Sequence, residues 1–246
     1  MRNLLIRISP LVLLLVLLNG CKDDKPSSKF TLNFAAKYGA ENFKLDSSYV
    51  NSDGRTMKFE KFKFFVSHIT LIKNDNSELE LKDVAIIDFS KPTTLRLSAD
   101  LDEGDFKAIR IGLGVDSAQN LTVPQQAPAS SALHSSQTGE MYWSWLKYTF
   151  QFIEGKYAEP GSENYYGAIL YHIGTDALYR TIIFNQTINV CCEKETQHTV
   201  TLDVKKIFDG PPAIDLPTEG VTESQESKYA IAEKFVGNFE QSFSFE

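Results

Sequence analysis

The stretch Thr56–Lys73, TMKFEKFKFFVSHITLIK, decides the fold class. Apolar and polar residues alternate along much of it, and aromatic and β-branched side chains are frequent, as in a β-strand with one buried face. The pattern recurs in KFTLNFAAKY (29–38), LELKDVAIIDF (79–89), FKAIRIGLGVD (106–116), WLKYTFQFIEG (145–155), YYGAILYHIG (165–174), YRTIIFNQTINV (179–190) and QHTVTLDVKKIF (197–208). Turn-forming stretches such as NSDG, NDNS, DEGD and EPGSEN separate these segments. The sequence therefore predicts an all-β protein, an antiparallel β-sandwich.

One helix is expected, near the C-terminus. Ala230, Lys234, Phe235, Phe239 and Phe243 follow helical spacing, which predicts a helix over about 226–240 with a phenylalanine face on the sheet. Two irregular regions interrupt the strands, at 120–141 and 208–227. Long loops of this kind in a compact domain are often functional.

The first residues have the features of a processing signal. Arg2 and Arg7 precede an apolar run, Leu11–Leu18, that is too short to span a bilayer, and LLNGC ends at Cys21. The segment resembles a bacterial lipobox, which implies a signal peptide at 1–20, lipidation of Cys21 and a polar tether at 21–29. We therefore expect a folded domain over 30–246, held on the outer membrane at its periplasmic or cell-surface face.

Charge and cysteine content narrow the classes of partner. The formal net charge is -7 and the sequence has no basic stripe, so nucleic acid is not expected as a ligand. Besides Cys21, the chain has only Cys191 and Cys192. Adjacent cysteines can close a strained vicinal disulfide, remain as two thiols, or form a redox or soft-metal pair; the plain thiols are the more ordinary outcome.

Familiar catalytic motifs are absent from the sequence: there is no GxSxG, HExxH or phosphate-binding loop. Carboxylates such as Asp116, Glu154 and Asp176 offer a hydrolase interpretation, but nothing in the sequence fixes their spacing. His68 and His198 are interpreted as ordinary strand imidazoles. We therefore do not expect an enzyme.

His134 and His172 are the better ligand candidates. His134 precedes Met141, Trp143 and Trp145, which period 2 would place on one face of a single strand. Such a stripe is usually sandwich core, but imidazole and thioether together also suit copper.

In order and spacing, GLGVDSAQN, GEMYWSW, FIEG and YHIG are similar to the MbnP-like family, exported copper-binding proteins related to the methanobactin-associated partner protein. The resemblance extends from about Phe30 to the C-terminal NFEQSFSFE. It implies a β-sandwich that holds copper through histidine and through a tryptophan oxidised to kynurenine by a dihaem enzyme of the MbnH type.

Carried over by position, His134 and His172 are the histidines, and Trp143 or Trp145 is the residue that would become kynurenine. The alternative hypothesis is a metal-free binding module for a glycan, a peptide or a partner lipoprotein. It would use the loop before Met141 together with exposed aromatic side chains.

Overall fold

The computed structural model describes residues 27–246. The predicted signal peptide (1–20), Cys21 and the first part of the predicted tether lie outside the described residues. The first strand, β1 (Ser27–Tyr38), pairs with β6 from its first residue, so residues 27–29 belong to the sheet and not to a tether. The reason is backbone pairing, which orders this polar stretch and buries Ser28.

Most of the regular structure is strand. The strands after β1 are β2 (Glu41–Asn42), β3 (Ser48–Val50), β4 (Thr56–Lys73), β5 (Glu78–Asp88), β6 (Arg96–Asp102), β7 (Gly104–Leu113), β8 (Tyr142–Trp143), β9 (Lys147–Ala158), β10 (Gly167–Gly174), β11 (Arg180–Phe184), β12 (Ile188–Val190), β13 (Thr196–Asp203), β14 (Val221–Thr222) and β15 (Phe243–Phe245). The fold is an all-β sandwich, as the alternation predicted.

The helices are short. They are α1 (Ser117–Asn120), α2 (Ser135–Thr138), α3 (Val204–Asp209), α4 (Leu216–Glu219) and α5 (Tyr229–Glu240), with 3-10 turns η1 (Pro92–Leu95), η2 (Gly139–Met141), η3 (Asp176–Leu178) and η4 (Glu226–Lys228). The predicted C-terminal helix is confirmed as η4 and α5. Within residues 27–246, no helix combines the length and the apolar character needed to cross a bilayer.

The prediction of one strand over 197–208 is wrong at its end. Strand β13 stops at Asp203, whose carboxylate accepts a hydrogen bond from the Lys205 backbone N–H at 3.2 Å and so begins helix α3. This capping bond satisfies a backbone N–H at the start of the helix. The alternation of apolar and polar residues cannot reveal such a bond, so it did not indicate where the strand ends.

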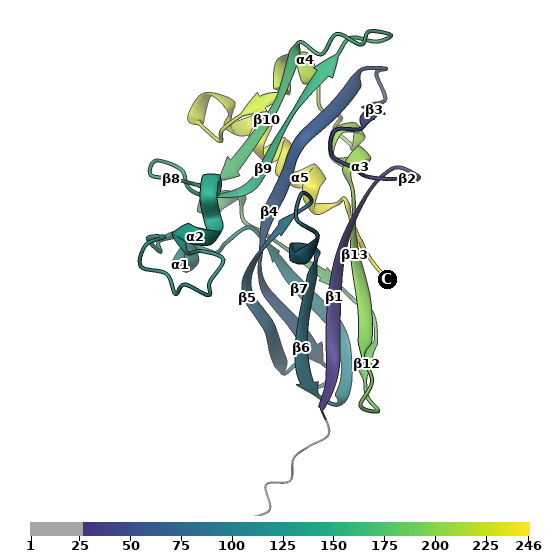
Figure 1. Ribbon diagram of the computed structural model, residues 1–246, viewed down its shortest axis with the longest axis vertical. Helices are drawn as coiled ribbons and strands as arrows, with labels where there is room; N and C mark the ends of the chain where they lie inside the picture. Colours follow the sequence, from purple (N-terminus) through teal and green to yellow (C-terminus); the bar gives the residue numbers. More distant parts are fainter. Residues whose placement is uncertain (1–26) are drawn as a thin grey trace, which may run out of the picture.

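Strand β4 organises the larger sheet, whose order is β11-β7-β4-β9-β10-β14 (Figure 1). Its N-terminal half pairs with β3 and β9, and its C-terminal half pairs with β5 and β7. The smaller sheet has the order β15-β13-β1-β2, with β6 also on β1. The pairs β1–β13 and β10–β14 are parallel, so the sandwich is mainly, not wholly, antiparallel.

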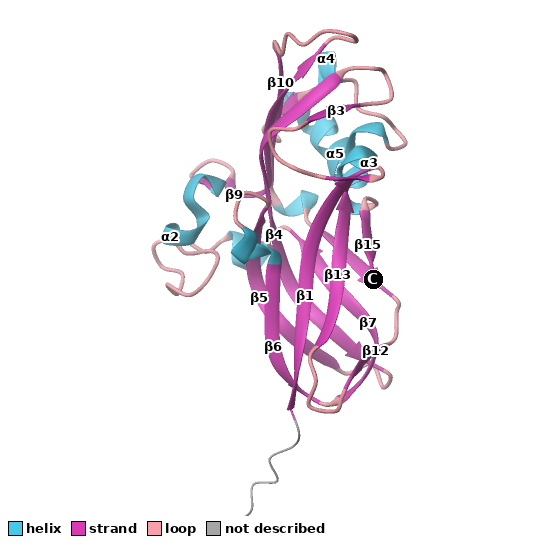
Figure 2. Cartoon of the chain, turned by 45° about the vertical axis from the view of Figure 1, so that its right-hand side comes forward, coloured by secondary structure: helices cyan, strands magenta, loops and turns pink. Residues whose placement is uncertain are grey.

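The main core fills the space between the sheets and beneath α5. It includes Phe59, Phe62 and Phe64 of β4 together with Phe235 and Phe239 of α5. Figure 2 shows the smaller sheet in front of the larger one in the lower half of the molecule, with α3 and α5 above.

A second apolar cluster lies apart from the main core. It is formed by side chains of β4, β5 and β9 with the segment from Val115 to Leu146: Phe65, Val84, Val115, Ala127, Leu133, Met141, Tyr148, Phe150 and Phe152. In Figure 1 this segment, with α1, α2 and β8, projects to one side of the sheets. We call it the outer cluster.

Candidate metal site at His172

The two tryptophans lie on a hairpin between η2 and β9. Strand β8 contains only Tyr142 and Trp143, which pair with Tyr148 and Lys147. The expected single strand from Met141 to Trp145 is therefore wrong: the chain turns between the tryptophans, and Lys147 enters β9 with φ +66°. Met141 is consequently buried, Trp143 half-buried and Trp145 58% exposed.

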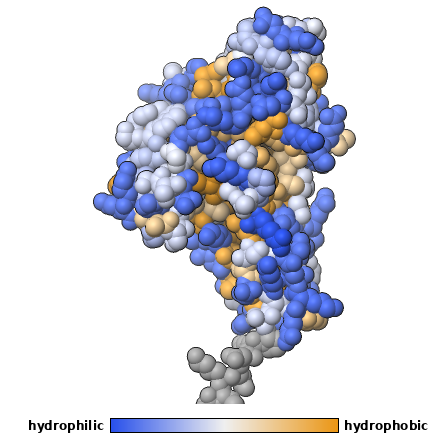
Figure 3. Space-filling view, in the orientation of Figure 1, coloured by the Kyte–Doolittle hydropathy of each residue, from blue (hydrophilic) through white to orange (hydrophobic). Residues whose placement is uncertain are grey.

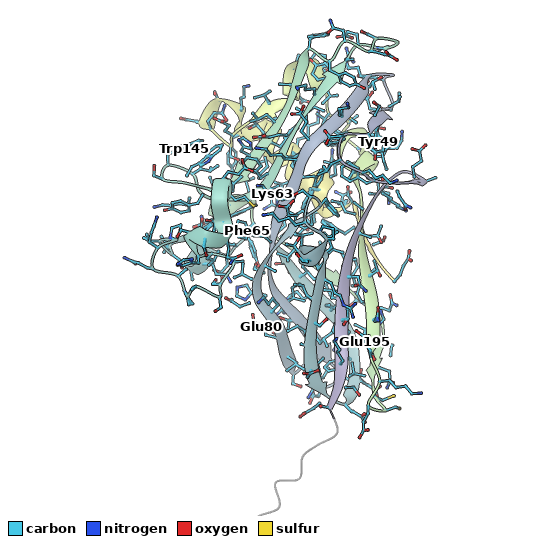
Figure 4. The ribbon with its side chains drawn as sticks, in the orientation of Figure 1. Tyr49, Lys63, Phe65, Glu80, Trp145 and Glu195 are labelled. Carbon is cyan, nitrogen blue, oxygen red and sulfur yellow. The ribbon has the colours of Figure 1, made fainter. Side chains whose placement is uncertain are left out.

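The hairpin still places the aromatic rings side by side. The ring centroids of Trp143 and Trp145 are 5.6 Å apart. The rings of Trp143 and His172 are in T-shaped contact, with centroids 4.7 Å apart and an interplanar angle of 86°. Trp145 is the outermost member of this group and points away from the sheets (Figure 4).

His172 is enclosed because of its position on β10. It lies opposite Phe152 of β9, and the two rings stack at 4.2 Å between centroids. Directly opposed residues of antiparallel strands share a face of the sheet, which explains this contact. With Trp143 covering it as well, His172 is only 4% exposed.

The two nitrogens of the His172 ring have different surroundings. Nε2 lies 3.1 Å from Oε1 of Glu154, within hydrogen-bond distance. Nδ1 has no hydrogen-bond partner; the nearest carboxylate oxygen, Oε1 of Glu223, lies 3.8 Å away. Burial lowers the pKa of His172 and outweighs the opposing hydrogen bond to Glu154. The imidazole is therefore neutral at neutral pH, with its proton on Nε2 and a free lone pair on Nδ1.

Glu154 belongs to a network that fixes the surrounding elements. Its Oε2 lies 3.0 Å from Nζ of Lys61, and that ammonium lies 2.7 Å from Oε2 of Glu140. Lys63 also binds Glu140, and its Nζ lies 4.8 Å from the Phe152 ring centroid. Since Glu140 immediately precedes Met141, these ion pairs hold η2 and the hairpin against β4 and β9.

The structure does not group every predicted ligand. Met141 and Trp143 pack in and against the outer cluster, and Trp143 contacts His172. His134 instead precedes α2, where its Nδ1 lies 2.8 Å from Oγ of Ser136. Within residues 27–246, no ring contact or hydrogen bond joins His134 to His172.

The cysteine pair lies in the connection between β12 and β13, away from both histidines. Cys191 and Cys192 are free thiols, half-buried and exposed respectively. A hydrogen bond with Cys192 raises the pKa of the Cys191 thiol, so the two sulfurs are neighbours. The predicted redox or soft-metal role stays a prediction.

Two functional side chains were not recognised in the sequence as parts of this site. Glu154 was weighed only as a hydrolase carboxylate, and Phe152 only as part of a strand. Period 2 in FQFIEG places both on one face of β9, but the pairing of β9 with β10 that brings His172 there is a long-range feature. Asp116 and Asp176, the other hydrolase candidates, contact His68 and Asn120 instead.

Comparison with solved structures finds the same fold. The chain is similar to MbnP from Methylosinus trichosporium, with a TM-score of 0.60 and 12% identity, over 89% of this chain and 98% of that chain. None of the curated proteins compared with the chain matches it. The MbnP family model matches residues 27–227, which include all of the predicted metal ligands. The chain therefore belongs to the MbnP family.

Proposed function

We propose that this protein is an exported, lipid-anchored copper-binding protein that acquires, stores or hands over copper, with His172 as its central ligand. The observation that carries the proposal is the buried, unpartnered Nδ1 of His172 beside Trp143. A neutral imidazole with its second nitrogen held by a carboxylate is the usual arrangement of a histidine that binds a metal. A buried lone pair without a partner is otherwise costly.

The donor set of the hairpin suits a soft metal. Met141 supplies a thioether in the outer cluster, and imidazole with thioether favours copper over hard cations. Trp143 offers no ligand atom as an indole, whose N–H only donates. Oxidation to kynurenine opens the indole ring and gives an aryl amine and a carbonyl oxygen, both of which can coordinate a metal. We propose Trp143 over Trp145 as the modified residue because Trp143 contacts His172.

Two resemblances support the remaining parts of the proposal: that of the chain to the MbnP-like family, and that of its first residues to a lipobox. A dihaem enzyme of the MbnH type would carry out the oxidation. The exposed Trp145 and the half-buried Trp143 lie where such a partner can reach them. The lipid anchor at Cys21 would hold the protein at the outer membrane, on the periplasmic or cell-surface face.

A groove favours the second candidate function, a metal-free binding module. It has a volume of about 600 Å³ and runs between β5 and η1 on one side and α2 and η2 on the other. Its lining mixes charged, polar and apolar groups, among them Lys63, Gln137 and Met141. Figure 3 shows apolar side chains at the centre of this face. A glycan or a short peptide would fit such a surface.

Copper(I) titration of the purified chain tests the primary function. His172→Ala should weaken binding by roughly 100-fold or more, since loss of a supporting residue alone costs 10–100-fold. His134→Ala is the matched control, and binding should persist in it. Tight binding that persists in His172→Ala would contradict the site and favour the binding module. Equal losses in both variants would mean that His134 is a second ligand.

Peptide mass spectrometry of the protein isolated from its own cells tests the modification. The peptide with Trp143 should show loss of a carbon atom and gain of an oxygen atom. An unmodified Trp143 in copper-loaded protein would limit the site to histidine and methionine.

A further inference from the structure

A bulge in β4 turns His68 out of the strand's regular alternation. His68 has φ +46°, a left-handed conformation uncommon for residues other than glycine. The register of β4 against β7 shifts between Ser67 and Thr70, on either side of this residue. Bulges of this kind re-aim a side chain. Here the bulge directs the imidazole toward carboxylates of other elements.

Both nitrogens of His68 meet a carboxylate. Nδ1 lies 3.0 Å from Oε1 of Glu80 on β5, and Nε2 lies 2.9 Å from Oδ2 of Asp116, which precedes α1. The second oxygen of Asp116 accepts a hydrogen bond from the Gln119 backbone N–H at 2.7 Å. Asp116 is thus held in place from the helix side while it faces the ring.

A further carboxylate, that of Asp83, lies close to the pair formed by His68 and Glu80. His68, Glu80 and Asp83 each offer a ligand atom within 4.8 Å of the others. Gln119 orients Asp83 by donating from Nε2 to Oδ1 at 2.7 Å, while its own Oε1 accepts from the Asp116 backbone N–H. One glutamine therefore links Asp83 to Asp116.

The spacing suits a shared cation. Metal bonds to histidine nitrogen and carboxylate oxygen measure about 2.0–2.2 Å, which places two tetrahedral ligands of one ion roughly 3.3–3.6 Å apart. Nδ1 of His68 and Oε1 of Glu80 lie 3.0 Å apart, close to that spacing. The neighbouring cation Arg110 is paired with Glu78, so it does not neutralise these carboxylates.

We propose that His68, Glu80 and Asp83 form a second metal site, for a borderline divalent ion such as zinc, with Asp116 positioning the imidazole. One nitrogen and carboxylate oxygens are harder donors than thioether and imidazole. The site at His68 therefore favours a harder metal ion than the site at His172 does. Asp116 on Nε2 supplies the carboxylate–histidine–metal arrangement. The half-exposed side chains leave room for water to complete the coordination. Figure 4 shows Glu80 on the β5 side of the molecule, well below Trp145.

Zinc titration of the chain tests the site. The Cys191→Ser, Cys192→Ser background removes those thiolates as competing ligands. In this background we expect one tight equivalent of zinc, a binding constant at least tenfold weaker in His68→Asn and Asp83→Asn, and a midpoint of thermal unfolding that rises with zinc. Asparagine suits the left-handed backbone at position 68, so the fold should persist.

Control variants separate the proposal from its competitors. Glu78→Gln removes a neighbouring exposed carboxylate of β5 that pairs with Arg110, and should leave zinc binding unchanged, whereas Glu80→Gln should weaken it. His172→Ala should also leave it unchanged. Zinc binding as strong in His68→Asn and Asp83→Asn as in the unsubstituted site would overturn the proposal and leave His68 as an ion-paired imidazolium.

Discussion

His172 and His68 both lie beside carboxylates, but their burial and the direction of their pKa shifts are opposite. His172 is 4% exposed, one nitrogen faces Glu154 and the other faces no partner, and its pKa is lowered. His68 is partly exposed, both nitrogens face carboxylates, and its pKa is raised. Burial sets the direction of the pKa shift of His172, whereas at His68 the hydrogen bonds and charges of two carboxylates together outweigh burial. Of these two histidines, only His172, which aromatic rings shield from water, keeps a free nitrogen lone pair at neutral pH.

The largest effect is expected from a substitution that removes part of the aromatic enclosure of His172. Phe152→Ala removes the ring that stacks on the imidazole and should lower the free energy of unfolding by about 3–5 kcal/mol, as for other buried phenylalanines. Denaturant unfolding measures the loss. Phe152→Leu, which keeps most of the volume, should cost clearly less. Equal losses for the two would mean that the aromatic ring itself, and not the buried volume, carries the contribution of this position.

Glu154→Gln should act on affinity more than on folding. It keeps the shape of the side chain but removes the charge that holds Nε2, so copper(I) binding should weaken by about 10–100-fold. Glu60→Gln is the matched control, since Glu60 pairs with Lys156 and not with a histidine. A similar loss in the control would show that surface charge, not the bond to His172, sets the affinity.

On the His68 side, Glu80→Gln should hardly affect stability in the absence of metal. The side chain is 49% exposed, and such ion pairs contribute about 1 kcal/mol or less. Chemical denaturation in the presence of a chelator measures this change. A loss of several kcal/mol would mean that the cluster is a structural anchor of β4 and β5.

Trp145→Ala should give the smallest effect. With 58% of its surface exposed, this tryptophan should change the free energy of unfolding by no more than about 0.5 kcal/mol, and copper(I) binding should persist. Thermal unfolding and titration check both parts. Loss of copper binding here, with Trp143 intact, would reassign the modified residue.

Alternation in the sequence was sufficient to predict the sandwich and the C-terminal helix, because both depend on local periodicity. It failed at the MxWxW segment, since a two-residue strand followed by a turn at residues 144–146 also tolerates alternating aromatic residues. His172 was recognised through the family resemblance. Its partners Glu154 and Phe152 depend on the register of β9 against β10, and the His68 cluster depends on a bulge, so neither could be derived from local pattern.

The most direct measurement is long-range ¹H–¹⁵N NMR of the histidine side chains, with His172 assigned by His172→Ala. The account predicts a neutral His172 at neutral pH, with the proton on Nε2, an unprotonated Nδ1, and a resonance of Nδ1 that shifts when copper(I) is added. A charged His172 imidazolium, a proton on Nδ1, or an Nδ1 resonance indifferent to copper would contradict it.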